Sequence, residues 1–169
     1  MTEQRKSADT RPPAFDPQDE KSVLLSFLNY QRTSIAAKAH GAPEPWARTA
    51  GVPSGTSLLG LIKHLTAAEG IWFEWSFAGA EVELADLDMK VGGDESAGQI
   101  LADYAAAVAR ANTVIEAAPD LSAPAARGMG PDREQHTLRW ILAHMIGETA
   151  RHAGHADILR EELDGSTGR

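Results

Sequence analysis

Apolar residues recur at helical spacing in four separate stretches of the chain. One apolar side chain every three or four positions lines a single face of a helix, so each stretch predicts an amphipathic helix with one buried face. The expected helices cover residues 17–38, 57–78, 97–118 and 138–164. No stretch shows a convincing alternation of apolar and polar residues, the pattern typical of a strand. We therefore expect an all-α protein, a four-helix bundle with long connecting loops.

Short polar side chains stand where the four helices are expected to begin. Such side chains accept hydrogen bonds from the free N–H groups of a first helical turn. The expected N-caps are Asp16 followed by Pro17, Thr56 or Ser57, Ser96 with Gln99 in a capping box, and Thr137. Gly79 is expected to end the second helix in a left-handed conformation.

The segments between the helices contain glycine, proline and charged residues, which favours loops. The connections around residues 40–55 and 118–137 are long enough to permit an overhand helix order instead of a simple up-and-down order. Trp46 is expected to anchor the first of them as its one large apolar side chain. Residues 1–14 are expected to form a flexible N-terminal leader, and residues 15–169 a single domain of ordinary size.

Charge and cysteine usage narrow the classes of function. The formal net charge is −8 and no basic cluster stands out, which argues against a nucleic-acid partner. The chain has no cysteine, so disulfides, thiolate metal sites and a cysteine nucleophile are excluded, and any metal must be held by His, Asp or Glu. No apolar run is long enough to span a bilayer and none resembles a signal peptide, so we expect a cytoplasmic protein without a membrane partner.

Two ionisable residues interrupt the apolar stripe of the last helix. The stripe begins with Leu138, Ile141, Leu142 and Met145, continues through Glu148, His152 and either His155 or Ala156, and ends at Leu159. A carboxylate on a buried stripe needs a cation, a hydrogen-bonding partner or local water, because removing a lone charge from water costs several kcal/mol. Glu148 and His152 are four residues apart and can reach one ion, although an exposed Glu–His pair is the simpler alternative.

Further histidines are candidate metal ligands. His40 and His136 lie at helix borders, where solvated or capping roles suffice, and His144 fits a packed core position or an inward-facing one. His64 lies at the edge of the buried stripe of the second helix. If the second and fourth helices are neighbours, His64, Glu148 and His152 supply two imidazoles and one carboxylate, a set that suits zinc, iron or nickel with an open position. Arg151, His155 and Asp157 are candidates for supporting contacts or for the substrate mouth; ordinary surface positions are the alternative for Arg151 and Asp157.

Two long stretches resemble a known superfamily. Residues 52–79 (VPSGTSLLGLIKHLTAAEGIWFEWSFAG) and 138–165 (LRWILAHMIGETARHAGHADILREELDG) are similar to the DinB-like metal-binding four-helix bundles. Within that superfamily they resemble the actinobacterial branch of mycothiol-dependent transferases and maleylpyruvate isomerases. The resemblance implies that His64, Glu148 and His152 bind a divalent metal. Glutamate at 148 favours the thiol-linked branch, whereas relatives commonly have glutamine where His155 stands.

The resemblance also implies a reaction. The expected function is a metal-dependent thiol S-transferase that binds a mycothiol-like low-molecular-weight thiol as a metal thiolate and transfers it to a small electrophile. Zn²⁺ is the expected metal, with Ni²⁺ and Fe²⁺ as alternatives. A second hypothesis is a non-catalytic, stress-associated metal-binding protein. A homodimer is compatible with either function.

Overall fold

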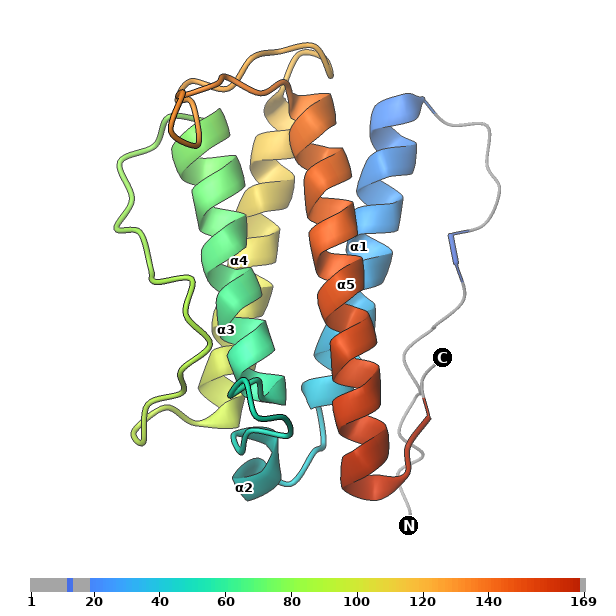
Figure 1. Ribbon diagram of the computed structural model, residues 1–169. Helices are drawn as coiled ribbons and strands as arrows, with labels where there is room; N and C mark the ends of the chain where they lie inside the picture. Colours follow the sequence, from blue (N-terminus) through green and yellow to red (C-terminus); the bar gives the residue numbers. More distant parts are fainter. Residues whose placement is uncertain (1–11, 14–18, 168–169) are drawn as a thin grey trace.

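The computed structural model describes residues 12–13 and 19–167. Four long helical segments form a bundle (Figure 1). The elements in chain order are α1 (Glu20–Ala39), α2 (Glu44–Ala47), α3 (Leu58–Glu69), its π-helical continuation η1 (Gly70–Phe77), α4 (Ala97–Ala117) and α5 (Leu138–Asp164). The prediction of an all-α bundle is therefore confirmed. Each helix among the described residues is either too short or too polar to cross a membrane.

The helix order is overhand. In Figure 1, α1 and α5 run in one direction, and α3 and α4 run in the other. Two parallel helices in succession need a connection as long as the bundle, and the segment between η1 and α4 runs along the outside of the bundle from one end to the other. The overhand order thus arises from residues 78–96 and not from either of the two connections that the sequence indicated.

Helix ends follow the capping chemistry at three of the four predicted sites. The side chains of Ser57, Ser96 and Thr137 each accept a hydrogen bond from the third residue after them. The side chain of Gln99 bonds Asp103 and not the cap, so only half of the predicted capping box forms. The first helix begins at Glu20 with Asp19 as its N-cap; the predicted cap at Asp16 and Pro17 lies outside the described residues.

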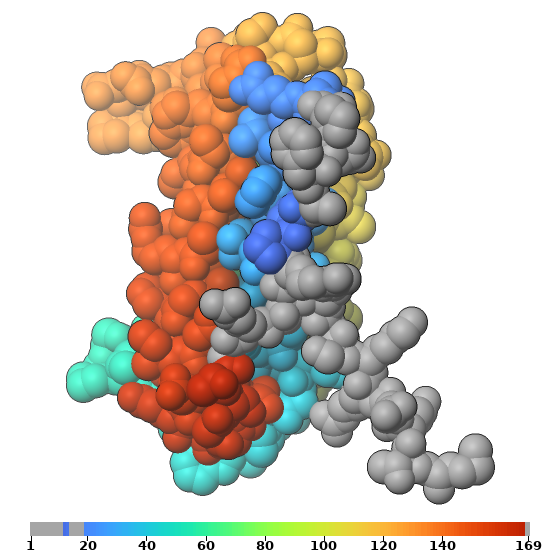
Figure 2. All heavy atoms as spheres, turned by 90° about the vertical axis from the view of Figure 1, so that its right-hand side faces the viewer, coloured from blue at the N-terminus to red at the C-terminus, as the bar shows by residue number. Residues whose placement is uncertain are grey.

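The core lies on the inward faces of the four long segments. Helices α1 and α5 pack side by side along one face of the molecule, as Figure 2 shows. The largest buried side chains on α5 are Leu138, Ile141, Leu142 and Met145, which the predicted stripe contained. The side chain of Trp46 is 62% exposed, whereas Ala47 beside it is buried. Trp46 is therefore not the anchor of its connection, because the short helix α2 turns Ala47 toward the core instead.

A buried ion pair joins α1 to α3. Arg32 donates to Glu69 through Nε at 2.7 Å and through Nη2 at 2.5 Å, and both side chains are almost completely buried. The remaining guanidinium nitrogen, Nη1, donates to Asn29 and to Asn112 of α4. Three helices are thus held at one level of the bundle, at the point where α3 passes into the π-helix. Such short π-helical segments occur often near functional sites.

Candidate metal centre

Two antiparallel helices bring together the three predicted metal ligands. His64 lies in the middle of α3, and Glu148 and His152 lie one turn apart on α5. One ligand atom from each of these residues lies within 4.8 Å of the others. Nε2 of His152 is 3.0 Å, and Nε2 of His64 is 3.4 Å, from the same oxygen of Glu148, Oε1. The three donors therefore converge on one point, although the sequence separates His64 from Glu148 by 84 positions.

The loop outside the bundle fixes the ring of His64. Nδ1 of His64 lies 2.8 Å from the carbonyl oxygen of Leu87. A carbonyl oxygen only accepts, so Nδ1 carries the proton and, in the neutral ring, Nε2 presents a lone pair to the centre. Gly60 lets the loop approach this closely, because a Cβ there would lie 2.3 Å from the carbonyl oxygen of Met89. The loop thus supplies the second contact that metal-binding imidazoles usually make.

Glu148 and His152 have shifted pKa values that suit ligation. Burial raises the pKa of Glu148, but the hydrogen bond from His152, the nearby imidazole of His64 and the charge of Arg151 together outweigh burial, so the pKa lies below its usual value. Burial also lowers the pKa of His152, against the opposing attraction of Glu148. At neutral pH the centre therefore holds the carboxylate of Glu148 and the neutral imidazole of His152. That donor set has a net negative charge and fits a divalent cation.

The three supporting residues suggested by the sequence lie in different places. Arg151 donates to Oε2 of Glu148 at 3.1 Å, which leaves Oε1 facing the imidazoles. His155 is exposed, with its ring 5.6 Å from that of His152, and Ala156 occupies the buried position of the stripe. Asp157 pairs with Lys38 of α1 at 2.6 Å and so belongs to the α1–α5 contact.

An aromatic cluster next to the centre was not predicted from the sequence. His136, Trp140 and His144 follow one another at intervals of four residues and stack, with ring centroids 3.7 Å and 5.1 Å apart and planes within 11°. Trp72 of η1 leans against all three, closest to His144 at 4.7 Å. We call these four side chains the aromatic wall. The spacing of four was visible in the sequence, but the part played by Trp72 depends on how η1 packs against α5.

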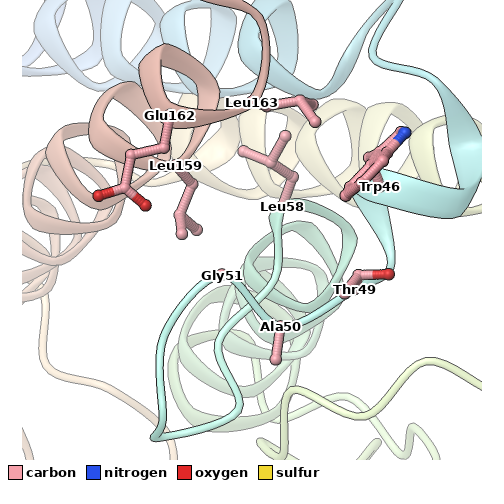
Figure 3. Close-up of a pocket in the computed structure, with 8 residues that line it drawn as sticks. All are labelled: Trp46, Thr49, Ala50, Gly51, Leu58, Leu159, Glu162 and Leu163. Atoms are coloured by element: carbon pink, nitrogen blue, oxygen red, sulfur yellow. The ribbon is translucent and has the colours of Figure 1, made fainter.

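Two cavities lie along the helices, one on each side of the metal centre. A cavity of about 360 Å³ is lined by the wall residues Trp72 and His136 and by loop residues between Met129 and Glu134. A second cavity, of about 310 Å³, lies near α2 and is shown in Figure 3. Its lining includes the aliphatic side chains of Leu58, Leu159 and Leu163 and the ring of Trp46. The first cavity is therefore bordered by η1, the continuation of the helix that carries His64, and the second by α3 and α5 themselves.

Comparison with known families decides the classification. The sequence model of a family described as mycothiol-S-transferase matches residues 23–165, a range that includes all three convergent side chains. The chain belongs to the mycothiol-S-transferase family. Mycothiol-S-transferases are DinB-like proteins, so the resemblance found in residues 52–79 and 138–165 is confirmed.

A solved structure shows the same fold. The crystal structure of a conserved protein from Enterococcus faecalis superimposes with a TM-score of 0.65 over 88% of this chain and 99% of that one. The two sequences are 16% identical, so this likeness concerns the fold alone. A search of curated proteins found no match to this chain.

Proposed function

We propose that this member of the mycothiol-S-transferase family is a divalent-metal-dependent thiol S-transferase with mycothiol, or a close relative of it, as the thiol. The observation that carries the proposal is the convergence of His64, Glu148 and His152 on one point. The family match supports the choice of thiol. The chain contains no cysteine, so the reacting sulfur has to come from a bound co-substrate.

His64, Glu148 and His152 would hold the metal. A divalent ion there lowers the pKa of a thiol that it binds, so that the sulfur is present as thiolate near neutral pH. Zn²⁺ fits two imidazoles and one carboxylate best, and Ni²⁺ or Fe²⁺ accept the same donors. The protein keeps the donors in place before substrate arrives, through the Leu87 carbonyl on His64 and Arg151 on Glu148.

The reaction that this centre supports is a nucleophilic substitution or addition by sulfur. With an alkyl halide such as 2-chloro-N-methylacetamide, a sulfur–carbon bond forms, the carbon–chlorine bond breaks and chloride leaves with the bonding electron pair. The thiol proton passes to the solvent, which reaches the centre because all three ligand side chains are slightly exposed. Holding sulfur and carbon next to each other contributes the rest of the rate enhancement.

The test measures chloride release from 2-chloro-N-methylacetamide with mycothiol as the thiol. We expect Zn²⁺-loaded wild-type protein to accelerate release, and a chelator to abolish the acceleration. His152→Ala should remove both bound metal and rate, whereas His40→Ala, a change at an exposed histidine, should alter neither. A wild-type rate that survives complete metal removal would refute the proposal. Bound metal without thiol-dependent turnover, over a panel of electrophiles, would favour a non-catalytic metal-binding protein.

A further inference from the structure

The aromatic wall begins next to the metal centre and leads away from it. His144 precedes Glu148 by one helical turn, which is about 6 Å along the axis of α5. Trp72 follows His64 by about two turns and touches His144. The wall ends at the cavity of about 360 Å³ that Trp72 and His136 share with the 129–134 loop. A ligand held by sulfur at the metal would therefore extend along the wall into this cavity.

The rings of the wall are partly open to solvent, although the faces of Trp140 are taken up by its stacking on His136 and His144. The side chain of Trp140 is 42% exposed, and the other three rings are half-buried. Contacts between the rings already restrict their orientations, so a ligand that packs on them costs little side-chain entropy. Exposed aromatic side chains with a fixed orientation are typical of ligand-binding surfaces.

The loop on the far side of the cavity adds hydrogen-bonding groups. Met129 and Glu134 exchange two backbone hydrogen bonds, at 3.0 and 3.1 Å, which hold the residues between them in a tight turn. The side chains of Asp132 and Glu134 line the cavity, and both are exposed carboxylic acids. Carboxylates accept hydrogen bonds from hydroxyl groups and repel anions. A cavity between aromatic rings and carboxylates suits a neutral ring that carries several hydroxyl groups.

We propose that the aromatic wall and the 129–134 loop bind the polyhydroxylated ring portion of the thiol co-substrate. Mycothiol joins its sulfur-bearing N-acetylcysteine to an amino sugar and an inositol. The C–H face of such a ring packs on Trp72 and His136, the two wall residues that line the cavity, and its hydroxyl groups donate to Asp132 and Glu134. This inference rests on the proposed function and adds the part of the protein that selects the thiol.

The cavity in Figure 3 is the poorer candidate for the same ring system. It lies on the opposite side of the metal centre, because Leu58 precedes His64 by six residues and Leu159 follows His152 by seven. Most of its side chains are aliphatic, and Glu162 is its one carboxylate. Aliphatic walls leave the hydroxyl groups of a polyol without partners, which is unfavourable. Trp46 in this cavity offers a matched control for the tryptophans of the wall.

The first test compares two thiols that differ only in the ring portion. Chloride release from 2-chloro-N-methylacetamide is measured with mycothiol and with N-acetyl-L-cysteine. Trp140→Ala removes the ring that stacks on His136 and so holds His136 at the cavity. We expect this change to lower kcat/KM about threefold to tenfold with mycothiol, the range that one aromatic stacking contact contributes, and to change it less than twofold with N-acetyl-L-cysteine. Trp46→Ala should leave the ratio of the two thiols as in wild type. Equal losses with both thiols in Trp140→Ala would overturn the proposal.

The second test does not require turnover. The amino sugar–inositol disaccharide, which lacks sulfur, is titrated into Zn²⁺-loaded protein while the four indole N–H signals are followed by NMR. We expect the signals of Trp72 and Trp140 to shift in a saturable way while those of Trp46 and Trp75 stay in place. A shift of Trp46 instead, or no shift of any signal, would overturn the proposal. If no thiol supports turnover yet Trp72 and Trp140 respond, the proposed reaction fails while the ring-binding site stands.

Discussion

Replacing Glu69 by glutamine is expected to lower the free energy of unfolding by about 3–5 kcal/mol, the range found when one partner of a buried ion pair is removed. The structure places this pair in that class, because the side chain of Glu69 is fully buried and that of Arg32 is 2% exposed. Burial raises the pKa of Glu69 and Arg32 opposes that shift. An arginine guanidinium is charged at all ordinary pH values, so glutamine at position 69 leaves a buried cation without its counter-charge.

Loss of the buried ion pair should also affect the metal centre. Helix α1 packs along α5 and is joined to α3 through Arg32 and Glu69, whereas α3 and α5 contact each other much less. Loosening the pair therefore weakens the constraint that keeps His64 opposite Glu148. We expect Glu69→Gln to weaken Zn²⁺ binding as well as stability, although it changes no ligand.

Urea denaturation of the metal-free protein, followed by far-UV circular dichroism, measures the stability change. The matched control is Glu20→Gln, which breaks the exposed pair with Arg139 and should leave stability almost unchanged. A double variant, Arg32→Met with Glu69→Leu, should lose less than Glu69→Gln because no unpaired charge remains. If Glu69→Gln were as stable as Glu20→Gln, the structural role given to the buried pair would be wrong.

Three further predictions concern packing, the loop and pH. Leu142→Ala should lower the unfolding free energy by about 2–5 kcal/mol while the Zn²⁺ stoichiometry stays unchanged, because Leu142 is a core residue and not a ligand. Loss of the metal site in this variant would contradict that distinction. Gly60→Ala places a Cβ 2.3 Å from the carbonyl oxygen of Met89 in the 78–96 segment and should weaken Zn²⁺ binding in calorimetric titration, whereas Gly93→Ala, with open space around it, should not. Burial lowers the pKa of His144 below its ordinary 6.5, so the unfolded chain takes up a proton first and the metal-free protein loses stability as the pH falls below about 6.5. Urea denaturation of His144→Gln should show a smaller loss of stability between pH 7.5 and 5.5 than wild type shows. An equal loss in both proteins would contradict the role given to His144.

The sequence carried the information for the helices and for the ligand pair on α5. Glu148 and His152 stood out because they occupy positions where the helical period calls for apolar residues. Thr137, Ser57 and Ser96 fixed three helix starts because capping depends on residues only three positions apart. Features of this kind depend only on residues three or four positions apart, so the sequence alone predicts them.

Contacts between distant residues were not predictable in the same way. Glu69 lies four residues after Leu65 and three before Trp72, where helical spacing also calls for an apolar residue, but its pairing with Arg32 of another helix cannot be read from spacing. The Leu87 carbonyl reaches His64 only because the 78–96 segment runs along the length of the bundle. Every residue has a backbone carbonyl, so the sequence does not indicate which one makes such a contact. The aromatic wall likewise needed the position of Trp72 relative to α5.

The central claim is that donors from two helices hold one divalent ion. Calorimetric titration of Zn²⁺ into the metal-free protein tests it most directly when wild type, His64→Ala and His40→Ala are compared. Wild type and His40→Ala should each bind one Zn²⁺ per chain at a single site, and His64→Ala should bind it far more weakly while remaining helical. Binding of equal strength in His64→Ala and wild type would contradict the account.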